Sequence, residues 1–222
     1  MKRALIVALV AAAAFAGYVL VPPSGPRSMR HFNADRMADL ELRMWQAYYG
    51  KAKVRVFRLL VTMLHEQYHY SWAVATIEGF HLARAAATFA HAKDHYDAVL
   101  PDLEAAYGTA REWLHAGFDP HAVARAELAW WVARRIPGQN SAPQVGRLMA
   151  DEYALLYEAP RERVVRAALL RAEAAALRDA ESEHPDWTTI GRLLQESYRE
   201  LLSALTSVNV RLTNRPSLQS VA

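Results

Sequence analysis

The chain has 222 residues, of which 53% are hydrophobic and 22% are charged; this is the composition of a globular protein and excludes wholesale disorder. Four of the 26 Lys and Arg residues lie before residue 34, where there is no acidic residue, so the remainder is nearly neutral. Such a domain has no electrostatic attraction for a phosphate backbone, and we expect no nucleic-acid partner. The absence of cysteine excludes disulfides, thiolate nucleophiles and Cys-ligated metals.

The first 21 residues have the pattern of a signal peptide or membrane anchor. Lys2 and Arg3 precede an uncharged apolar run at residues 4–21, which as a helix would be about 27 Å long, close to the roughly 30 Å of a hydrocarbon core. Cleavage at the A-x-A pattern of residues 14–16 would release a secreted domain. The run continues through residues 18–21, which favours an uncut anchor. We expect a membrane partner through residues 4–21 and a domain in the periplasm or outside the cell.

Beyond this segment the sequence predicts an all-α fold. Residues 22–33 are rich in Pro, Ser and Gly and are expected to form a linker. Residues 34–207 carry recurrent helix signals, which predict a single compact domain of about seven or eight antiparallel helices. The first helix is expected to begin near Asn33 and to end at Gly50. Residues 52–78 are apolar on nearly every side and predict a central, buried helix with a break at Gly79.

The later helices share a start signal that contains proline. Proline in the first turn costs no hydrogen bond, because its backbone nitrogen would have no helical partner there. The starts fall at residues 97–101, 119–120, 141–143, 159–160 and 185–186. The last helix is predicted from about Trp187 to Thr206, and residues 208–222 are predicted to be a disordered tail.

The sharpest chemical motif is H-E-x-x-H at residues 65–69. On a helix, His65 and His69 share a face and could bind one zinc ion while Glu66 acts as general base on a bound water. A third ligand is missing at the usual spacing, so it must come from elsewhere in the chain. The candidates are Glu41, Glu127, Asp151 and Glu152.

The same residues allow a second metal hypothesis. Glu66 and His69 form an E-x-x-H pair, and so do Glu78 and His81. This is the ligand spacing of ferritin-like di-iron proteins. In those proteins the two pairs lie on separate helices with a whole helix between them, whereas here they are close in sequence. The spacing therefore argues against a ferritin-like site.

A binding cleft is the alternative for Trp131 and Arg135, which share a helix face. The leading hypothesis for the whole chain is a non-catalytic binding or scaffold module of the cell envelope, with no cofactor. The alternatives are a zinc-dependent hydrolase that uses residues 65–69 and a ferritin-like metal-binding protein. Whether the protein is an enzyme stays open, with the balance toward a binding role.

Overall fold

The structure is a computed structural model, and it describes residues 2–181 and 183–213, with side chains described from residue 5 to residue 206. The described residues are all-helical, as predicted, with nine α-helices and one short 3-10 helix. The helices are α1 (Lys2–Leu20), α2 (Ala34–Tyr49), α3 (Lys53–Tyr68), α4 (Trp72–His91), η1 (Tyr96–Val99), α5 (Leu100–Leu114), α6 (Pro120–Ala133), α7 (Ala142–Leu156), α8 (Arg161–Ala180) and α9 (Trp187–Thr213).

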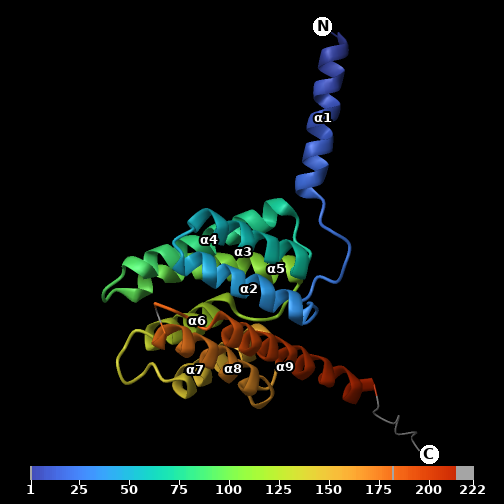
Figure 1. The fold of residues 1–222 in the computed structure, drawn as a ribbon. Coiled ribbons are helices and arrows are strands. Elements are labelled where there is room, and N and C mark those ends of the chain that lie inside the picture. The colour runs from blue at the N-terminus through green and yellow to red at the C-terminus, as the bar shows by residue number, and fades with distance from the viewer. Residues whose placement is uncertain (1, 182, 214–222) are drawn as a thin grey trace, which may run out of the picture.

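Helices α2 to α9 form one bundle, in agreement with the predicted seven or eight. Each of them packs against the next along the chain, and α9 returns to pack against α2, which closes the order. Figure 1 shows α2 to α5 in one layer and α6 to α9 in the other, with α1 rising from the first layer away from the bundle. The hydrophobic core is continuous through both layers.

Local capping explains most of the helix starts. The side chain of Asn33 accepts a hydrogen bond from the backbone N–H of Arg36 and caps α2, and Asp119 caps α6 ahead of its first-turn proline. Asp186 accepts from the N–H groups of Thr188 and Thr189 at the start of α9. These side chains satisfy N–H groups that have no helical partner, which is why their positions were readable from the sequence.

The predicted helix over residues 52–78 is wrong, because this segment forms two helices. His69 adopts a left-handed conformation with φ of 54° and ends α3, and Ser71 then caps α4. Gly79, where a break was predicted, lies inside α4 against α3. A Cβ at Gly79 would lie 3.1 Å from Cγ2 of Val61, so the missing side chain serves the close approach of the two helices.

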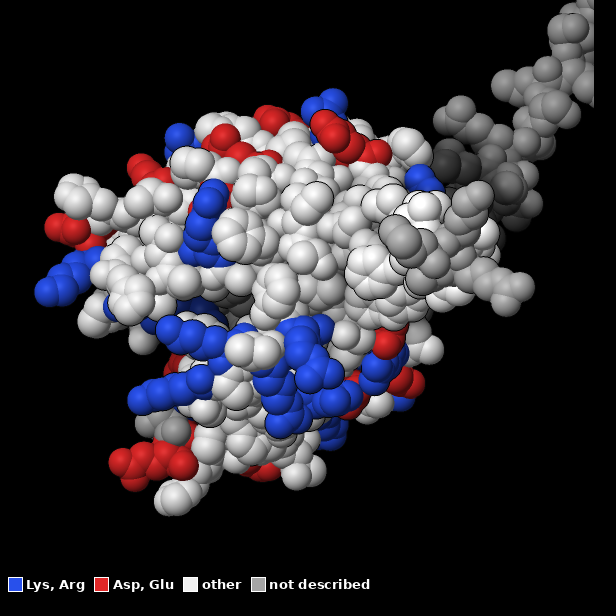
Figure 2. Space-filling model, turned by 90° about the horizontal axis from the view of Figure 1, so that it is seen from above, with Lys and Arg blue, Asp and Glu red and all other residues white. Residues whose placement is uncertain are grey.

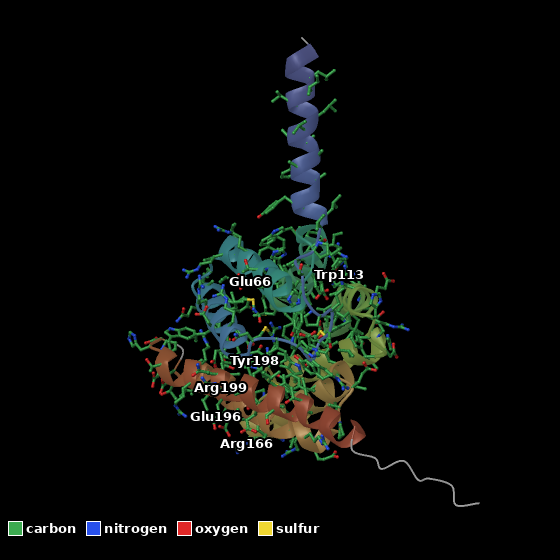
Figure 3. The ribbon with its side chains drawn as sticks, turned by 90° about the vertical axis from the view of Figure 1, so that its right-hand side faces the viewer. Glu66, Trp113, Arg166, Glu196, Tyr198 and Arg199 are labelled. Carbon is green, nitrogen blue, oxygen red and sulfur yellow. The ribbon has the colours of Figure 1, made fainter. Side chains whose placement is uncertain are left out.

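The predicted linker at residues 22–33 lies against the bundle. The guanidinium carbon of Arg27 is 4.2 Å from the centre of the Trp113 ring. Arg30 donates hydrogen bonds to the carbonyl oxygens of Tyr157 and Glu158 at 3.0 and 2.6 Å. The segment is therefore tied to both layers, and Figure 3 shows Trp113 near the root of α1.

The two ends of the chain differ from their predictions. No helix in the described part of the chain combines the length and the apolar character needed to cross a membrane, so the predicted anchor stays a proposal. Helix α9 continues to Thr213, past the predicted end near Thr206. The predicted disorder of residues 208–222 is therefore wrong for 208–213, and its remainder, 214–222, lies outside the described residues.

Candidate functional site

The two histidines of the H-E-x-x-H string bind different carbonyl groups. Nδ1 of His65 lies 2.7 Å from the carbonyl oxygen of Tyr70, and the His65 ring stacks on Trp72 with ring centres 3.7 Å apart. Nδ1 of His69 lies 3.1 Å from the carbonyl oxygen of Pro26, in the segment that leads to α1. Because a carbonyl oxygen only accepts, each imidazole donates from Nδ1. Both rings thus fix the chain around the α3–α4 turn.

Glu66 and Gln67, within the string, bind the start of α2 to the end of α3. Glu66 accepts hydrogen bonds from Nε and Nη2 of Arg36 at 2.8 and 3.1 Å, and Gln67 accepts from the backbone N–H of Asn33 at 2.9 Å. Across the residues with described side chains, no group of three His, Asp or Glu is placed to hold a metal ion. The side chains of the string therefore hold α2, α3 and the segment before α2 together. The described residues place no third metal ligand beside the two histidines.

Of the four proposed third ligands, Asp151 is exposed and pairs with Arg161, and the other three lie in a largely buried polar network between the two layers. Glu41 on α2 accepts hydrogen bonds from Nε and Nη2 of Arg171 on α8, at 2.9 and 2.6 Å. Glu127 on α6 accepts from the Tyr107 hydroxyl at 2.7 Å. Both candidates are thus occupied by partners within the bundle.

Glu127 and Glu152 form a buried pair of carboxyl groups within this network. The Tyr107 hydroxyl lies 3.5 Å from Oε1 of Glu152, and the Trp130 indole N–H donates to Oε2 of the same residue. Burial and the neighbouring charge of Glu127 raise the pKa of Glu152 well above its ordinary range, and burial raises the pKa of Glu127. The charge of each group disfavours ionisation of the other, and the nearby Arg171 guanidinium partly offsets this.

The two residues of the second E-x-x-H pair, Glu78 and His81, also contact different groups. His81 lies with Nδ1 3.0 Å from Oδ1 of Asp102, which also binds Arg84. Glu78 points into the bundle and is 5% exposed, and its Oε2 atom has no hydrogen-bond partner among the described residues. Burial raises the pKa of Glu78 to about 8, partly offset by the Tyr70 hydroxyl. The two E-x-x-H pairs therefore serve separate contacts.

Trp131 lies on α6 and Arg135 in the turn that follows it, and both contact the C-terminal end of α4. The guanidinium carbon of Arg135 lies 3.7 Å from the centre of the Phe89 ring, and the rings of Trp131 and Phe89 are 5.1 Å apart. Arg135 also donates to the carbonyl oxygen of Ala92 at 3.0 Å. The proposed cleft is thus filled by the C-terminal end of α4.

A surface that sequence reasoning missed lies on the side of the bundle from which α1 rises. Ile77 and Phe80 on α4 are each 53% exposed, and Val54 on α3 is 75% exposed. Figure 2 looks down on this side and shows Lys and Arg side chains gathered beside a broad uncharged area. An apolar surface with a basic border is the composition expected of an interaction site. We call Val54, Ile77, Phe80 and the basic residues described next the outward face.

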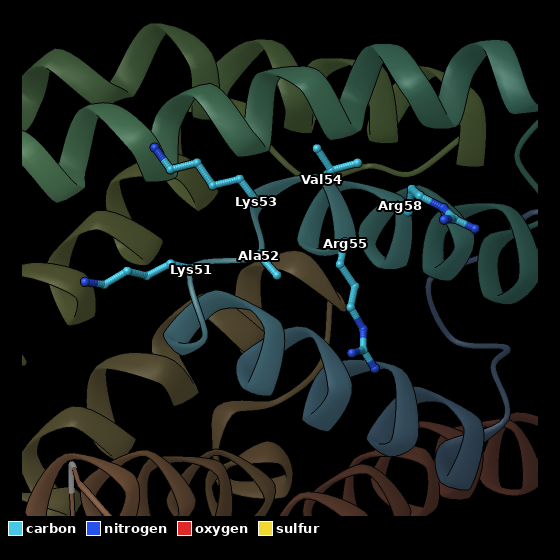
Figure 4. Close-up of a pocket in the computed structure, with 6 residues that line it drawn as sticks. All are labelled: Lys51, Ala52, Lys53, Val54, Arg55 and Arg58. Atoms are coloured by element: carbon cyan, nitrogen blue, oxygen red, sulfur yellow. The ribbon is translucent and has the colours of Figure 1, made fainter.

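The basic part of the outward face surrounds the start of α3. Lys51, Lys53, Arg55 and Arg58 line an open pocket of about 600 Å³. Figure 4 shows their side chains spread around this corner, with Arg55 extending toward α2. The sequence did carry a signal for this surface, because residues 42–65 contain five basic and no acidic side chains.

The geometry defines a closed helical bundle with one protruding apolar helix and an outward face beside it. No protein-family profile, curated protein or solved structure matches this chain.

Proposed function

We propose that the chain is a membrane-anchored scaffold or binding module of the cell envelope, held at the bilayer by α1. The observation that carries this proposal is the exposure of apolar side chains along α1, outside the bundle. Leu5, Val7, Leu9, Val10 and Phe15 are each more than 60% exposed. Apolar side chains at this density have no favourable environment in water, and a bilayer would remove them from it.

The direction of the anchor follows from the flanking charges. Lys2 and Arg3 precede the apolar run, which favours the N-terminus on the cytoplasmic side and the bundle in the periplasm or outside the cell. Arg27 and Arg30 follow the run, but both are engaged by the bundle through Trp113 and the carbonyl oxygens near residue 157. Two basic residues thus flank each side of the run, so the charge bias toward this orientation is weak.

The interior supports a scaffold role for the bundle. Among its most perturbed carboxyl groups, Glu78 and Glu152 are buried and Glu127 is partly buried, and none of them lines the pocket at the start of α3. A substrate would need access to such groups for them to act as general acid or base. The contacts of Glu127 and Glu152 link α5, α6 and α7.

Membrane fractionation of the full chain tests the anchor. We expect the wild-type chain to stay in the membrane pellet after an alkaline wash, and a Leu9→Arg/Val10→Arg variant to move to the supernatant. Leu155→Arg on α7 is the matched control, because Leu155 is also an exposed large apolar residue but lies in the bundle. It should stay in the pellet.

The mass of the intact chain completes the test. A mass that includes residues 1–21 supports an uncut anchor, whereas loss of the first 16 residues would identify a cleaved signal peptide. Recovery of the uncut wild-type chain in the supernatant would contradict the anchor.

A further inference from the structure

Four basic side chains of the outward face lack an acidic partner. Among the residues with described side chains, Lys51, Lys53, Arg55 and Arg58 form no ion pair, although many other arginines of the protein do. The exposed acidic residues closest in sequence are already engaged: Asp39 and Glu66 both bind Arg36. The positive charge of this corner is therefore uncompensated, and it would attract a negatively charged surface.

The apolar part of the same face lies on the side of α1. The ring of Tyr18, near the C-terminal end of α1, is 6.3 Å from the ring of Trp72, which begins α4. Ile77 and Phe80 follow on α4 within the next turns and point outward. Exposed apolar side chains thus lie on α4 as well as on α1, and α4 contacts α1.

We propose that the outward face docks onto an anionic lipid surface, with Val54, Ile77 and Phe80 at the headgroup level and the four cations among the phosphates. This inference rests on the proposed anchoring by α1, which would bring the face to the membrane. The occupant follows from chemistry: unpaired cations require anions, and exposed aliphatic and aromatic side chains beside them suit the boundary between headgroups and acyl chains. The surface of an anionic membrane provides both the anionic phosphates and this boundary.

Docking would fix the orientation of the bundle. Each Lys or Arg near an anionic surface strengthens attraction about fivefold at moderate salt, so four of them would favour the docked state over a freely swinging bundle by about two orders of magnitude or more. The contacts of Arg27 and Arg30 with the bundle shorten the free segment after α1 and hold the face close to the membrane. In neutral lipid this attraction would be absent.

A single fluorescent label can report docking, because the chain has no cysteine of its own. We would place an environment-sensitive dye on Ile77→Cys in the full chain, reconstituted into vesicles of phosphatidylcholine with increasing phosphatidylglycerol. The control label is Arg166→Cys on α8, which lies at the end of the bundle opposite to α1 (Figure 3). We expect quenching of the Ile77 dye by headgroup-brominated or spin-labelled lipid to rise with the anionic fraction, and the Arg166 dye to stay unquenched.

Charge reversal separates the basic corner from general electrostatics. Arg55→Glu/Arg58→Glu should shift the anionic-lipid dependence of the Ile77 dye by more than tenfold. Arg192→Glu/Arg199→Glu, which changes two exposed arginines of α9 by the same charge, should leave it unchanged. High salt should have the same effect as the first variant.

Flotation of the same vesicles tells the two proposals apart. A chain that floats with neutral and anionic vesicles while the Ile77 dye stays in water would overturn the docking and leave the anchor intact. A chain that floats only with anionic vesicles would overturn the anchor and keep the docking. Equal quenching in neutral and anionic vesicles, or an equal loss in both charge-reversal variants, would also reject the role of the basic corner.

Discussion

The buried carboxyl groups between α2 and the α6–α8 helices have hydrogen-bond partners. Glu41 binds Arg171, and Glu152 accepts a hydrogen bond from the Trp130 indole and lies beside the Tyr107 hydroxyl. Beside the α3–α4 turn, Glu78 is also buried, but its polar neighbour is the Tyr70 hydroxyl, and neither Oε2 of Glu78 nor that hydroxyl makes a hydrogen bond of ordinary geometry. Burial of charge is costly unless it is paired. The first region pairs the Glu41 carboxylate with a buried guanidinium, whereas burial raises the pKa of Glu78 to about 8, so Glu78 is protonated at pH 7.

This difference fits the roles proposed for the two regions. The α6–α8 side is tied by polar contacts that cross both layers, which suits a rigid scaffold. The α3–α4 side leaves charge unpaired only at its surface, in the outward face. The variants below test the comparison by making one region resemble the other.

The largest expected effect comes from removing the buried cation. Arg171→Met should lower the free energy of unfolding by about 3–5 kcal/mol, because it leaves the Glu41 carboxylate buried without its partner. Urea unfolding at pH 7 measures this. Arg166→Met, on an exposed position of the same helix, should cost less than about 1 kcal/mol. If Glu41→Leu/Arg171→Leu were as unstable as Arg171→Met, loss of the pair would not be the cause.

The second effect has the opposite sign and depends on pH. The folded pKa of Glu78 is about 8, against 4.5 for a free glutamic acid side chain, so the folded state binds more protons between these values. Stability therefore falls as pH rises from about 4.5 to 8, because folding must keep the proton that the unfolded chain releases. Glu78→Gln removes this loss and should stabilise the protein by about 3 kcal/mol at pH 7, but by less than about 1 kcal/mol at pH 5.

Unfolding of both proteins in urea across this pH range checks the slope. Glu173→Gln makes the same chemical change at an exposed position of α8 and serves as the control. A stabilisation by Glu78→Gln that did not grow with pH would show that Glu78 is ionised in the folded protein.

A smaller effect is expected at the H-E-x-x-H string. His65→Ala removes the hydrogen bond to the Tyr70 carbonyl oxygen and the stacking on Trp72, and should cost about 1–2 kcal/mol. Glu66→Gln alters only an exposed ion pair and should cost about 0.5 kcal/mol or less. Both costs should be the same with added zinc and with a chelator. Zinc-dependent stability of the wild type that is lost in His65→Ala would restore the metal hypothesis.

The fold was more predictable than the site because its signals are local. Asn33, Asp119 and Asp186 mark helix starts by capping groups only two or three residues away, which a sequence displays directly. The partners of Glu41 and Glu127 come from distant helices, and no spacing along the chain reveals them. The H-E-x-x-H periodicity assumes a continuous helix, whereas the backbone leaves the helix at His69, so the shared face that the spacing predicts for the two imidazoles is not formed. The outward face was missed because its charges are spread along an otherwise apolar stretch.

The last prediction compares the packing around two helical glycines. A Cβ at Gly146 on α7 would lie 3.0 Å from Cα of Leu169 on α8, so Gly146→Ala should separate the two helices and cost about 1–3 kcal/mol despite the better helix propensity of alanine. A Cβ at Gly108 on α5 meets no described atom within 4 Å. Gly108→Ala should therefore stabilise the protein by about 0.5–1 kcal/mol through helix propensity alone. Thermal unfolding of both variants measures the difference, and stabilisation by both would mean that α7 and α8 are packed more loosely than the polar contacts around them imply.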